Sequence, residues 1–373
     1  MFRKQQTQII KDLEKKIVFI VGPRQVGKTW LAKEVAKMFP KSMLLNYDSF
    51  EDRQIIQTET WANSTELLIF DELHKMRGWK NFLKGVFDTK PTNQKILVTG
   101  SARLDTFRQS GDSLAGRFFT HRLLPFSLSE TYRSQTSITL ERLIERSGFP
   151  EPLLADKTAD AKRWRNQFID GLLRQDILDF GHLNNLYAIK SIFELLRRRV
   201  GSPVSYASIA QDVKISPTTV EKYVNILEAL FIIFKIHPFS KNIARSLLKT
   251  PKIYFYDNGL VEGDAGQKFE NFVALSLLKH IYAVYDEKGD EQKLCYLRTK
   301  EKKEVDFCLT QGDKIKVAIE AKFSFSKLSK NLAYFCKKYD LAGIQIVQNL
   351  KRERSVGSID IVGAESYLQG LYL

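Results

Sequence analysis

Residues 17–29 read IVFIVGPRQVGKT, and this stretch decides the fold of the first part of the chain. Five apolar residues predict a buried strand, and the loop after them has the pattern G-x-x-x-x-G-K-[ST]. Glycine lets the backbone fold around phosphate, N–H groups at the start of the following helix bind its oxygens, Lys28 reaches the β and γ phosphates, and Thr29 ligates Mg²⁺. We therefore predict binding of ATP with Mg²⁺ by eight residues, namely Gly22, Pro23, Arg24, Gln25, Val26, Gly27, Lys28 and Thr29.

A carboxylate that completes the Mg²⁺ shell is expected on a neighbouring strand. Residues 67–75, LLIFDELHK, supply four apolar residues and then Asp71 and Glu72. We expect Asp71 to hold the Mg²⁺ shell and Glu72 to orient and polarise the attacking water, which favours hydrolysis over binding alone. The alternative is an acid pair that only forms a turn or a helix cap. Thr99 and Ser101, which end the next predicted strand, are placed to sense the γ-phosphate, although a plain turn explains them as well.

Composition limits the kinds of protein that this sequence forms. The chain has 373 residues, 43% of them hydrophobic and 12% aromatic, which suits two or three domains and excludes a disordered or fibrous chain. No apolar run approaches the roughly 18 residues of a membrane helix, and the N-terminus lacks the apolar segment of a secretory signal. We therefore expect a cytoplasmic protein without a membrane span. Three widely spaced cysteines without a C-x-x-C pair argue against a disulfide framework and a structural zinc site.

The chain is basic, with a formal net charge of +15. A field of this sign attracts polyanions, so nucleic acid is the partner class that it favours. A basic surface also keeps a protein in solution, and charge alone therefore does not decide the partner.

The pattern along the chain predicts an α/β protein with three parts. In residues 1–138, short β-branched runs alternate with helical patterns, as in the parallel sheet of a P-loop NTPase. The buried strands predicted there are KIVFIVG, SMLLNYD, ELLIFDE and KILVTGS. Residues 139–250 are mostly helical, and Gly201 is placed to end one of these helices as a C-terminal cap. In residues 251–373 strands return after one helix, which predicts a second α/β domain. The boundaries rest on clusters of turn residues.

Six blocks of the sequence resemble those of a known family: GPRQVGKTWLAKEV, LNYD, IFDELHK, VTGSARL, SLAGRF and LLPFSLSE. They look like the corresponding blocks of the AAA-type P-loop ATPases of bacteria and archaea that end in a C-terminal domain of uncharacterised function. The resemblance covers nearly the whole chain. It implies that the glycine-rich loop is the Walker A motif and that Asp71 and Glu72 are the Walker B pair. It makes Ser101 the sensor, where related ATPases often have Asn, and Arg117 a candidate arginine finger.

An arginine finger accelerates hydrolysis by about 10³-fold to 10⁵-fold, and an ATPase that lacks one in its own site often takes it from a neighbouring subunit. The resemblance therefore implies a homo-oligomer in which Arg117 acts in trans. Two other interpretations are that Arg117 pairs locally with Asp112 or that it is solvated.

Residues 205–236 read as a helix, a turn and a second helix. Ser216 is placed as the N-cap of the second helix and Pro217 as its first residue. The spacing matches a winged helix-turn-helix, with FIIFKIHPF, residues 231–239, as the first wing strand. Its second helix would present to the DNA major groove the side chains of Thr218, Thr219 and Lys222. The other interpretation, a structural lid or a protein-interaction module, is favoured because this helix is poor in Arg, Asn and Gln, which usually read bases.

The stretch VAIEAKF, residues 317–323, carries an acid and a base inside an apolar strand. Read with a period of two, Glu320 and Lys322 fall on the face opposite Ile319. Fourteen residues earlier, Asp306 ends another alternating strand, and the turn chemistry between them predicts a hairpin. Asp306 and Glu320 are therefore expected to lie near each other on paired strands.

Two carboxylates that are drawn out of water repel each other unless a cation offsets their charge, and a divalent metal would do so. Glu270 lies on the apolar stripe of a predicted helix, so a third carboxylate is available. Together with Lys322, these three acids resemble the core of the PD-(D/E)XK nucleases. The resemblance implies that Asp306 and Glu320 hold Mg²⁺, that Glu270 completes the shell, and that Lys322 positions the water or stabilises the phosphate. Glu304 is a substitute ligand, although its lysine neighbours favour a solvated side chain.

These patterns predict an ATP-hydrolysing AAA-type protein with a winged-helix-like segment and a C-terminal nuclease-like domain that acts on DNA with a divalent metal. Two alternatives remain for the last domain. Glu320 and Lys322 form a surface ion pair on an edge strand, or the domain is one of the copies of this fold that have lost catalysis. The protein would then be a nucleotide-dependent switch or binding module whose C-terminal domain recognises a partner.

Overall fold

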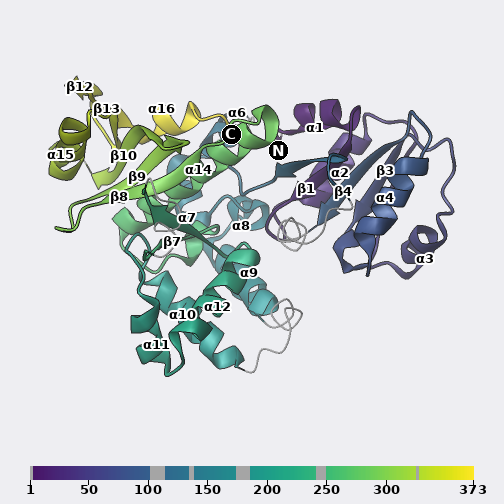
Figure 1. The fold of residues 1–373 in the computed structure, drawn as a ribbon, viewed down its shortest axis with the longest axis horizontal. Coiled ribbons are helices and arrows are strands. Elements are labelled where there is room, and N and C mark those ends of the chain that lie inside the picture. The colour runs from purple at the N-terminus through teal and green to yellow at the C-terminus, as the bar shows by residue number, and fades with distance from the viewer. Residues whose placement is uncertain (1–2, 101–113, 134–137, 174–184, 241–248, 325–326) are drawn as a thin grey trace. The chain divides into compact units, whose positions relative to one another are not determined.

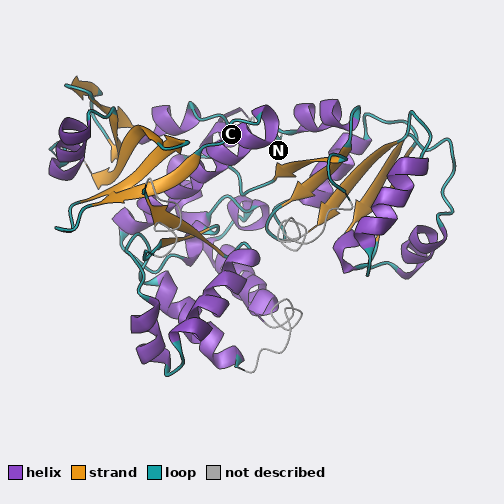
Figure 2. Ribbon diagram, viewed as in Figure 1, coloured by secondary structure: helices purple, strands orange, loops and turns teal. Residues whose placement is uncertain are grey.

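The computed structural model describes the chain in six stretches, which are residues 3–100, 114–133, 138–173, 185–240, 249–324 and 327–373. These residues form two units, Met1–Leu124 and Pro125–Leu373. The division into three domains therefore stays a prediction, because the structure groups the second and third parts into one unit. Figure 1 and Figure 2 show the elements of each unit.

The first unit is a parallel sheet with helices packed around it. Its helices are α1 (Gln6–Leu13), α2 (Lys28–Ala36), α3 (Phe50–Thr58), α4 (Trp79–Thr89) and the short 3-10 helix η1 (Leu73–Lys75). Its strands are β1 (Ile17–Val21), β2 (Ser42–Asn46), β3 (Leu67–Asp71), β4 (Lys95–Gly100) and β5 (Phe118–Arg122). The four strands that the apolar runs predict are all present, whereas β5 was not predicted. All residues of β1 and β3 are buried, as expected for strands covered on both faces.

The strand order of this sheet is β2-β3-β4-β1-β5, and every neighbouring pair is parallel. The expectation that Asp71 lies on the strand next to β1 is wrong, because β4 is hydrogen-bonded between β1 and β3. The carboxyl ends of parallel strands meet at one edge of a sheet. Asp71 at the end of β3 can therefore still reach the loop after β1 across the end of β4.

The second unit combines helices with a mixed sheet. Its helices are α6 (Leu128–Arg133), α7 (Leu140–Arg146), α8 (Pro150–Leu154), α9 (Thr158–Gly171), α10 (Leu186–Arg197), α11 (Tyr206–Val213), α12 (Pro217–Ala229), η5 (Asn258–Leu260), α14 (Ala265–Lys288), α15 (Lys330–Tyr339) and α16 (Ala364–Gln369). Its strands are β6 (Ile233–Pro238), β7 (Lys252–Phe255), β8 (Lys293–Arg298), β9 (Glu304–Gln311), β10 (Lys314–Ser324), β11 (Gly343–Asn349), β12 (Arg354–Val356) and β13 (Ile359–Gly363). The order in the sheet is β12-β13-β11-β10-β9-β8-β6-β7.

Strand β6 joins the middle of this unit to its C-terminal sheet. It pairs antiparallel with β7 and parallel with β8. A strand was predicted here as the first wing strand of the mostly helical part. Its membership of the same sheet as β9 and β10 was not predicted. This membership explains why the two parts form one unit.

Local sequence signals account for the ends of several helices. Ser216 Oγ accepts a hydrogen bond from the N–H of Thr219, and Pro217 is the first residue of α12, as predicted. Asp264 and Gln267 form a capping box at the start of α14. Gly201 does not cap α10, which ends at Arg197. Its φ of 77° and its position beside α14 explain the glycine instead, because a Cβ there would lie 2.7 Å from Oε1 of Glu270.

The hairpin of β9 and β10 is present as predicted, with Gly312 at a φ of 56° in its turn. Glu320 is 4% exposed, as expected for a carboxylate drawn out of water, whereas Phe323 near the end of β10 is 38% exposed. Among the described residues, no helix is both long enough and apolar enough to cross a membrane.

Candidate functional site

The loop after β1 has the backbone of a phosphate cradle. Gly22 and Gly27 have φ angles of 152° and 99°, and Gln25 is also left-handed at 57°. At Gly22 a Cβ would lie 2.1 Å from the carbonyl oxygen of Leu123, so only glycine fits there. Helix α2 begins at Lys28, directly after Gly27. Its N-terminus therefore opens on the loop, where unpaired N–H groups favour an anion.

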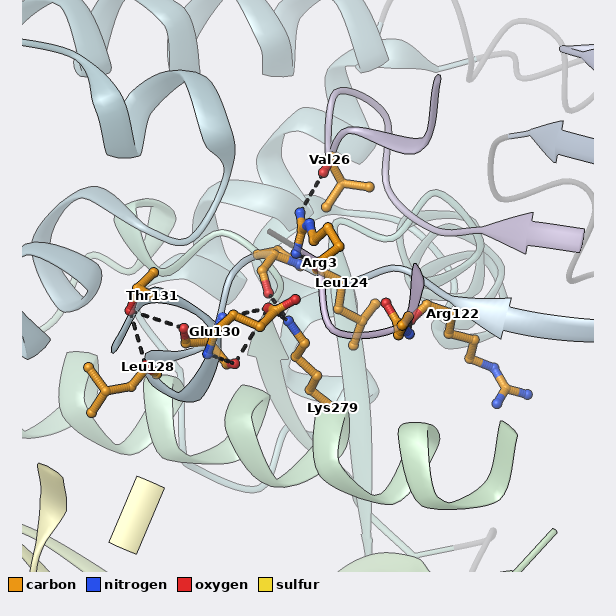
Figure 3. A network of polar contacts seen from close by, with 11 residues as sticks. Arg3, Val26, Arg122, Leu124, Leu128, Glu130, Thr131 and Lys279 are labelled. Carbon is orange, nitrogen blue, oxygen red and sulfur yellow. Dashed lines mark hydrogen bonds and ion pairs between the residues drawn. The ribbon is translucent and has the colours of Figure 1, made fainter. Parts of the chain in front are cut away.

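Two cationic side chains, those of Lys28 and Arg3, donate hydrogen bonds to carbonyl groups of this loop. The ammonium of Lys28 donates to Gly22 O at 3.0 Å and to Pro23 O at 2.6 Å. Burial lowers the pKa of Lys28 to about 8, although Glu72 and Asp71 oppose this effect. Arg3, which is 1% exposed, donates to Val26 O at 2.7 Å and to Leu124 O at 3.0 Å, as Figure 3 shows. Arg3 therefore ties the loop to the segment after β5.

Asp71, the predicted Walker B aspartate, lies against the loop. Thr29 Oγ1 donates to Asp71 Oδ2 at 2.9 Å, although the two residues are 42 positions apart in the chain. Thr99, at the end of β4, donates to the other oxygen of the same carboxylate. Thr99 therefore orients Asp71, a role that sequence analysis missed because it assigned this hydroxyl to the γ-phosphate. The hydroxyl and the carboxylate are hard oxygen donors, which fit Mg²⁺.

Glu72 lies at the end of β3 in a left-handed conformation, with a φ of 56°. Burial raises its pKa, while Lys28 and Lys75 act in the opposite direction. Its Oε2 is 3.6 Å from His74 Nε2 and 3.8 Å from Lys75 Nζ. A carboxylate with a raised pKa is a better proton acceptor, as a group that polarises water requires.

The two remaining predicted residues of this site have different outcomes. Ser101, the predicted sensor, lies outside the described residues. Arg117 pairs with Asp88 of α4, through Nε to Oδ1 at 3.0 Å and Nη2 to Oδ2 at 3.3 Å. Within one chain Arg117 is therefore bonded to a carboxylate, and its action in a neighbouring subunit stays a prediction.

The C-terminal carboxylates lie where the β9–β10 ladder ends. The last antiparallel pair is Phe307 with Ile319, so Asp306 and Glu320 follow as opposite residues. Asp306 Oδ2 accepts from the N–H of Ala321 at 3.0 Å and thus takes the place of a main-chain acceptor. The predicted proximity of the two acids on paired strands is consistent with this register.

Glu320 is a buried carboxylate with incomplete hydrogen bonding. Its Oε1 accepts from Lys322 Nζ at 2.8 Å and from Ser329 Oγ at 3.1 Å. Its Oε2 is buried and has no hydrogen-bond partner among the described residues. Burial and the nearby Asp306 raise the pKa of Glu320 to about 7, against the opposing effect of Lys322. The alternative of a surface ion pair on an edge strand is wrong, because Glu320 is buried and β10 lies between β9 and β11.

A lysine that sequence analysis missed lies among the other acids. Lys252, the first residue of β7, is 1% exposed, and its Nζ is 2.8 Å from Glu304 Oε1, 3.6 Å from Asp306 Oδ1 and 3.7 Å from Glu270 Oε1. Burial disfavours its charged form, but these carboxylates outweigh burial and raise its pKa. A charged residue in the otherwise buried strand KIYF is the signal that would have found it.

Glu270 and Glu304 are bonded differently from what was expected. Glu270 Oε1 accepts from the hydroxyl of Tyr254 at 2.8 Å, and burial together with Asp306 raises the pKa of Glu270 to about 8. Glu304 is half-buried and not a free surface side chain, because it pairs with Lys252 and with Arg298 at 3.0 Å. In the described ranges no three His, Cys, Asp or Glu side chains are arranged to hold a metal ion. The set of Glu270, Asp306 and Glu320 therefore does not fit the predicted three-carboxylate site.

The middle of the second unit presents three helices and a hairpin in sequence. Helices α10, α11 and α12, drawn in teal in Figure 1, are followed by β6 and β7, and Pro203 forms an antiparallel bridge with Lys252. On α12, Thr218 and Lys222 are exposed, while Thr219 is half-buried. The module contacts α14 just after α10, where Gln267 Nε2 of α14 donates to Val200 O at 3.3 Å.

Sequence comparison divides the chain into three matched regions. Residues 14–132 match the model of an AAA domain, residues 137–267 match a domain of unknown function (DUF8612), and residues 265–367 match another domain of unknown function (DUF4143). Neither of the last two models carries a nuclease description.

Similar proteins occur in bacteria and archaea. An uncharacterised protein of Mycobacterium tuberculosis is 26% identical over 246 residues, which are 66% of this chain and 55% of that protein. The match thus spans about half the length of this relative. An uncharacterised protein of Haemophilus influenzae is 26% identical over 337 residues, with 80% of each chain covered. The solved structure of a Walker-type ATPase of Pyrococcus abyssi aligns with a TM-score of 0.45 and 15% identity, covering 69% of this chain and 94% of that one.

Three features of the first unit agree with the AAA-domain match. They are the strand order, the loop with Gly22 and Gly27, and the hydrogen bond between Thr29 and Asp71. These features have one common explanation in a fold that binds nucleotide. The N-terminal unit therefore has the fold of an AAA-type P-loop ATPase.

Proposed function

We propose that the N-terminal unit binds ATP with Mg²⁺ and hydrolyses it. The observation that carries this proposal is the hydrogen bond of 2.9 Å between Thr29 and Asp71, because it brings the two predicted Mg²⁺ ligands together. Lys28 would bind the β and γ phosphates, and Glu72 would accept a hydrogen bond from the attacking water. Mg²⁺, when bound, neutralises charge on the phosphate oxygens.

Replacement of Glu72 tests the hydrolytic part of the proposal. The Glu72→Gln variant is expected to bind a fluorescent ATP analogue as the wild type does but to release phosphate about 10²-fold more slowly or worse, because it lacks the carboxylate. Glu59→Gln is the matched control, since Glu59 is also left-handed, with a φ of 52°, but is exposed at the end of α3. Unchanged phosphate release by Glu72→Gln would exclude Glu72 from catalysis.

We propose further that a homo-oligomer supplies Arg117 in trans. Arg117 immediately precedes β5, next to β1, and its pair with Asp88 is partly exposed, so another anion can compete for it. Turnover per chain is then expected to rise with protein concentration in the wild type and to lose this dependence in Arg117→Ala. Turnover that is independent of concentration would contradict the oligomeric site.

For the C-terminal unit we propose a nuclease-like domain that acts on DNA. The support comes from Asp306 and Glu320 on paired strands, from Lys322 beside Glu320, and from the net charge of +15. The order of α10, α11, α12 and the β6–β7 hairpin supports a winged helix next to this domain.

The test is cleavage of plasmid DNA with Mg²⁺ or Mn²⁺ present. Glu320→Ala is expected to abolish cleavage, and Lys28→Ala is expected to change its dependence on ATP. Glu291→Ala is the matched control, because Glu291 is also the acid of an E-x-K tripeptide and pairs with Lys293 at 3.4 Å, but on the surface.

A second candidate function is a nucleotide-dependent switch whose C-terminal domain is inactive and recognises a partner. The observation that favours it is the ammonium of Lys252 among Glu270, Glu304 and Asp306. Intact ATP hydrolysis without cleavage under any metal would support the switch and contradict the nuclease.

A further inference from the structure

Lys252 and the acids around it come from separate parts of the second unit. Lys252 belongs to β7 and to the region that matches DUF8612, whereas Glu270 on α14 and Glu304 and Asp306 on β9 belong to the region that matches DUF4143. The acidic cluster of the C-terminal sheet thus receives its central cation from the preceding region.

The backbone of Lys252 is fixed on both sides. It pairs with Ile236 of β6, and it forms the antiparallel bridge to Pro203. The side chain passes the ring of Tyr296, whose centroid is 5.5 Å from Nζ. A mobile surface lysine has none of these restraints, so the ammonium is held among the acids by the fold.

Electrostatics favours a cation among these acids. Uncompensated charges in a protein interior each cost several kcal/mol, and neighbouring carboxylates also repel one another. The Nζ of Lys252 is within 4 Å of three carboxylates and bonds Glu304 directly at 2.8 Å. A divalent ion between the same carboxylates would have to displace this ammonium.

We propose that Lys252 is the resident cation of this cluster and takes the place that a divalent ion would otherwise occupy between Glu270, Glu304 and Asp306. The inference deepens the C-terminal function proposed above and rests on it for the nature of the site. Glu270 and Glu304 are then partners of a lysine and not metal ligands, and any ion that the wild type binds there depends on Asp306 and Glu320. It also follows that the two matched regions build one site together.

Titration of the full chain with Mn²⁺, without nucleotide, tests the proposal. In Lys252→Met the acids lose their ammonium, so we expect Mn²⁺ to bind about tenfold more tightly than in the wild type or better, and to raise the melting temperature of the variant. Adding Glu270→Gln to this variant is expected to return its Mn²⁺ affinity to that of the wild type. In the wild type, Glu270→Gln alone is expected to leave Mn²⁺ affinity unchanged.

Lys279→Met is the matched control. Lys279 is also buried in this unit, where it donates to Glu130 and to Pro125 O at 2.8 Å, as Figure 3 shows. Its replacement removes a buried ammonium away from the cluster of three acids, so a general loss of stability is expected without tighter Mn²⁺ binding.

Two results would overturn the proposal. One is Mn²⁺ binding that Lys252→Met leaves unchanged, and the other is Mn²⁺ binding by the wild type that Glu270→Gln weakens. The second measurement decides the matter even if Lys252→Met does not fold. DNA cleavage is measured separately: a wild type without cleavage refutes the nuclease but not the resident lysine, whereas cleavage with Mn²⁺ held by Glu270 refutes the lysine but not the nuclease.

Discussion

Replacing Glu320 with glutamine is expected to remove a pH-dependent loss of stability. Burial and Asp306 raise the pKa of this carboxyl from 4.5 to about 7 in the folded chain. The folded chain therefore binds the proton more tightly than the unfolded chain. By linkage, the protonated carboxyl stabilises the folded chain. This contribution to the free energy of unfolding is fully present below pH 4.5 and is lost as the pH rises through about 7.

The size of the effect follows from the two pKa values. Because one pH unit of difference in pKa corresponds to about 1.4 kcal/mol, the carboxyl contributes about 3 kcal/mol in total. About 2 kcal/mol of this is lost between pH 5.5 and pH 8.5, because at pH 5.5 the carboxyl is already ionised in the unfolded chain but still protonated in the folded chain. Glutamine resembles the protonated acid in shape and does not ionise, so the variant keeps this stability at pH 8.5.

Urea unfolding of the full chain in EDTA, at both pH values, provides the measurement. The free energy of unfolding of Glu320→Gln minus that of the wild type is expected to be about 2 kcal/mol larger at pH 8.5 than at pH 5.5. Glu291→Gln, in an exposed E-x-K pair, is expected to show no such difference. If Glu320→Gln and the wild type lose stability in parallel between the two pH values, the carboxyl is not held in its protonated form and the reasoning fails.

Two further predictions concern backbone space and a buried ion pair. Gly22→Ala is expected to weaken ATP binding and to cost about 1–3 kcal/mol of stability, because its φ is 152° and its Cβ would lie 2.1 Å from a carbonyl oxygen. Gly85→Ala, where a Cβ would have no atom within 4 Å, is the control and should not be destabilising in urea. Asp257→Leu is expected to cost about 3–5 kcal/mol, since it leaves buried Arg165 without this carboxylate. Asp160→Leu, in an exposed pair on α9, should cost less than about 1 kcal/mol, and equal losses for the two would contradict the argument from burial.

The candidate nucleotide site was largely predictable because its information is local. The loop from Gly22 to Thr29 is one continuous stretch whose glycines and helix start carry the chemistry. Asp71 was predictable because an acid directly after an apolar strand is visible in the sequence. The order of strands was not, because hydrogen bonding places β4 between β1 and β3, and no local pattern records which strands become neighbours.

The C-terminal cluster divides in the same way. The sequence by itself determined that charged side chains, Asp306 and Glu320 among them, lie on strands of a hairpin, since alternation and turn residues are properties of the chain. Only the tertiary structure decided which charges meet. Lys252 is more than fifty residues from Asp306, yet the pairing of β6 with β8 carries β7 into the same sheet and brings its ammonium among the acids. The physical reason is that buried charge is compensated by whichever opposite charge lies close in space, and that proximity is a property of the folded chain.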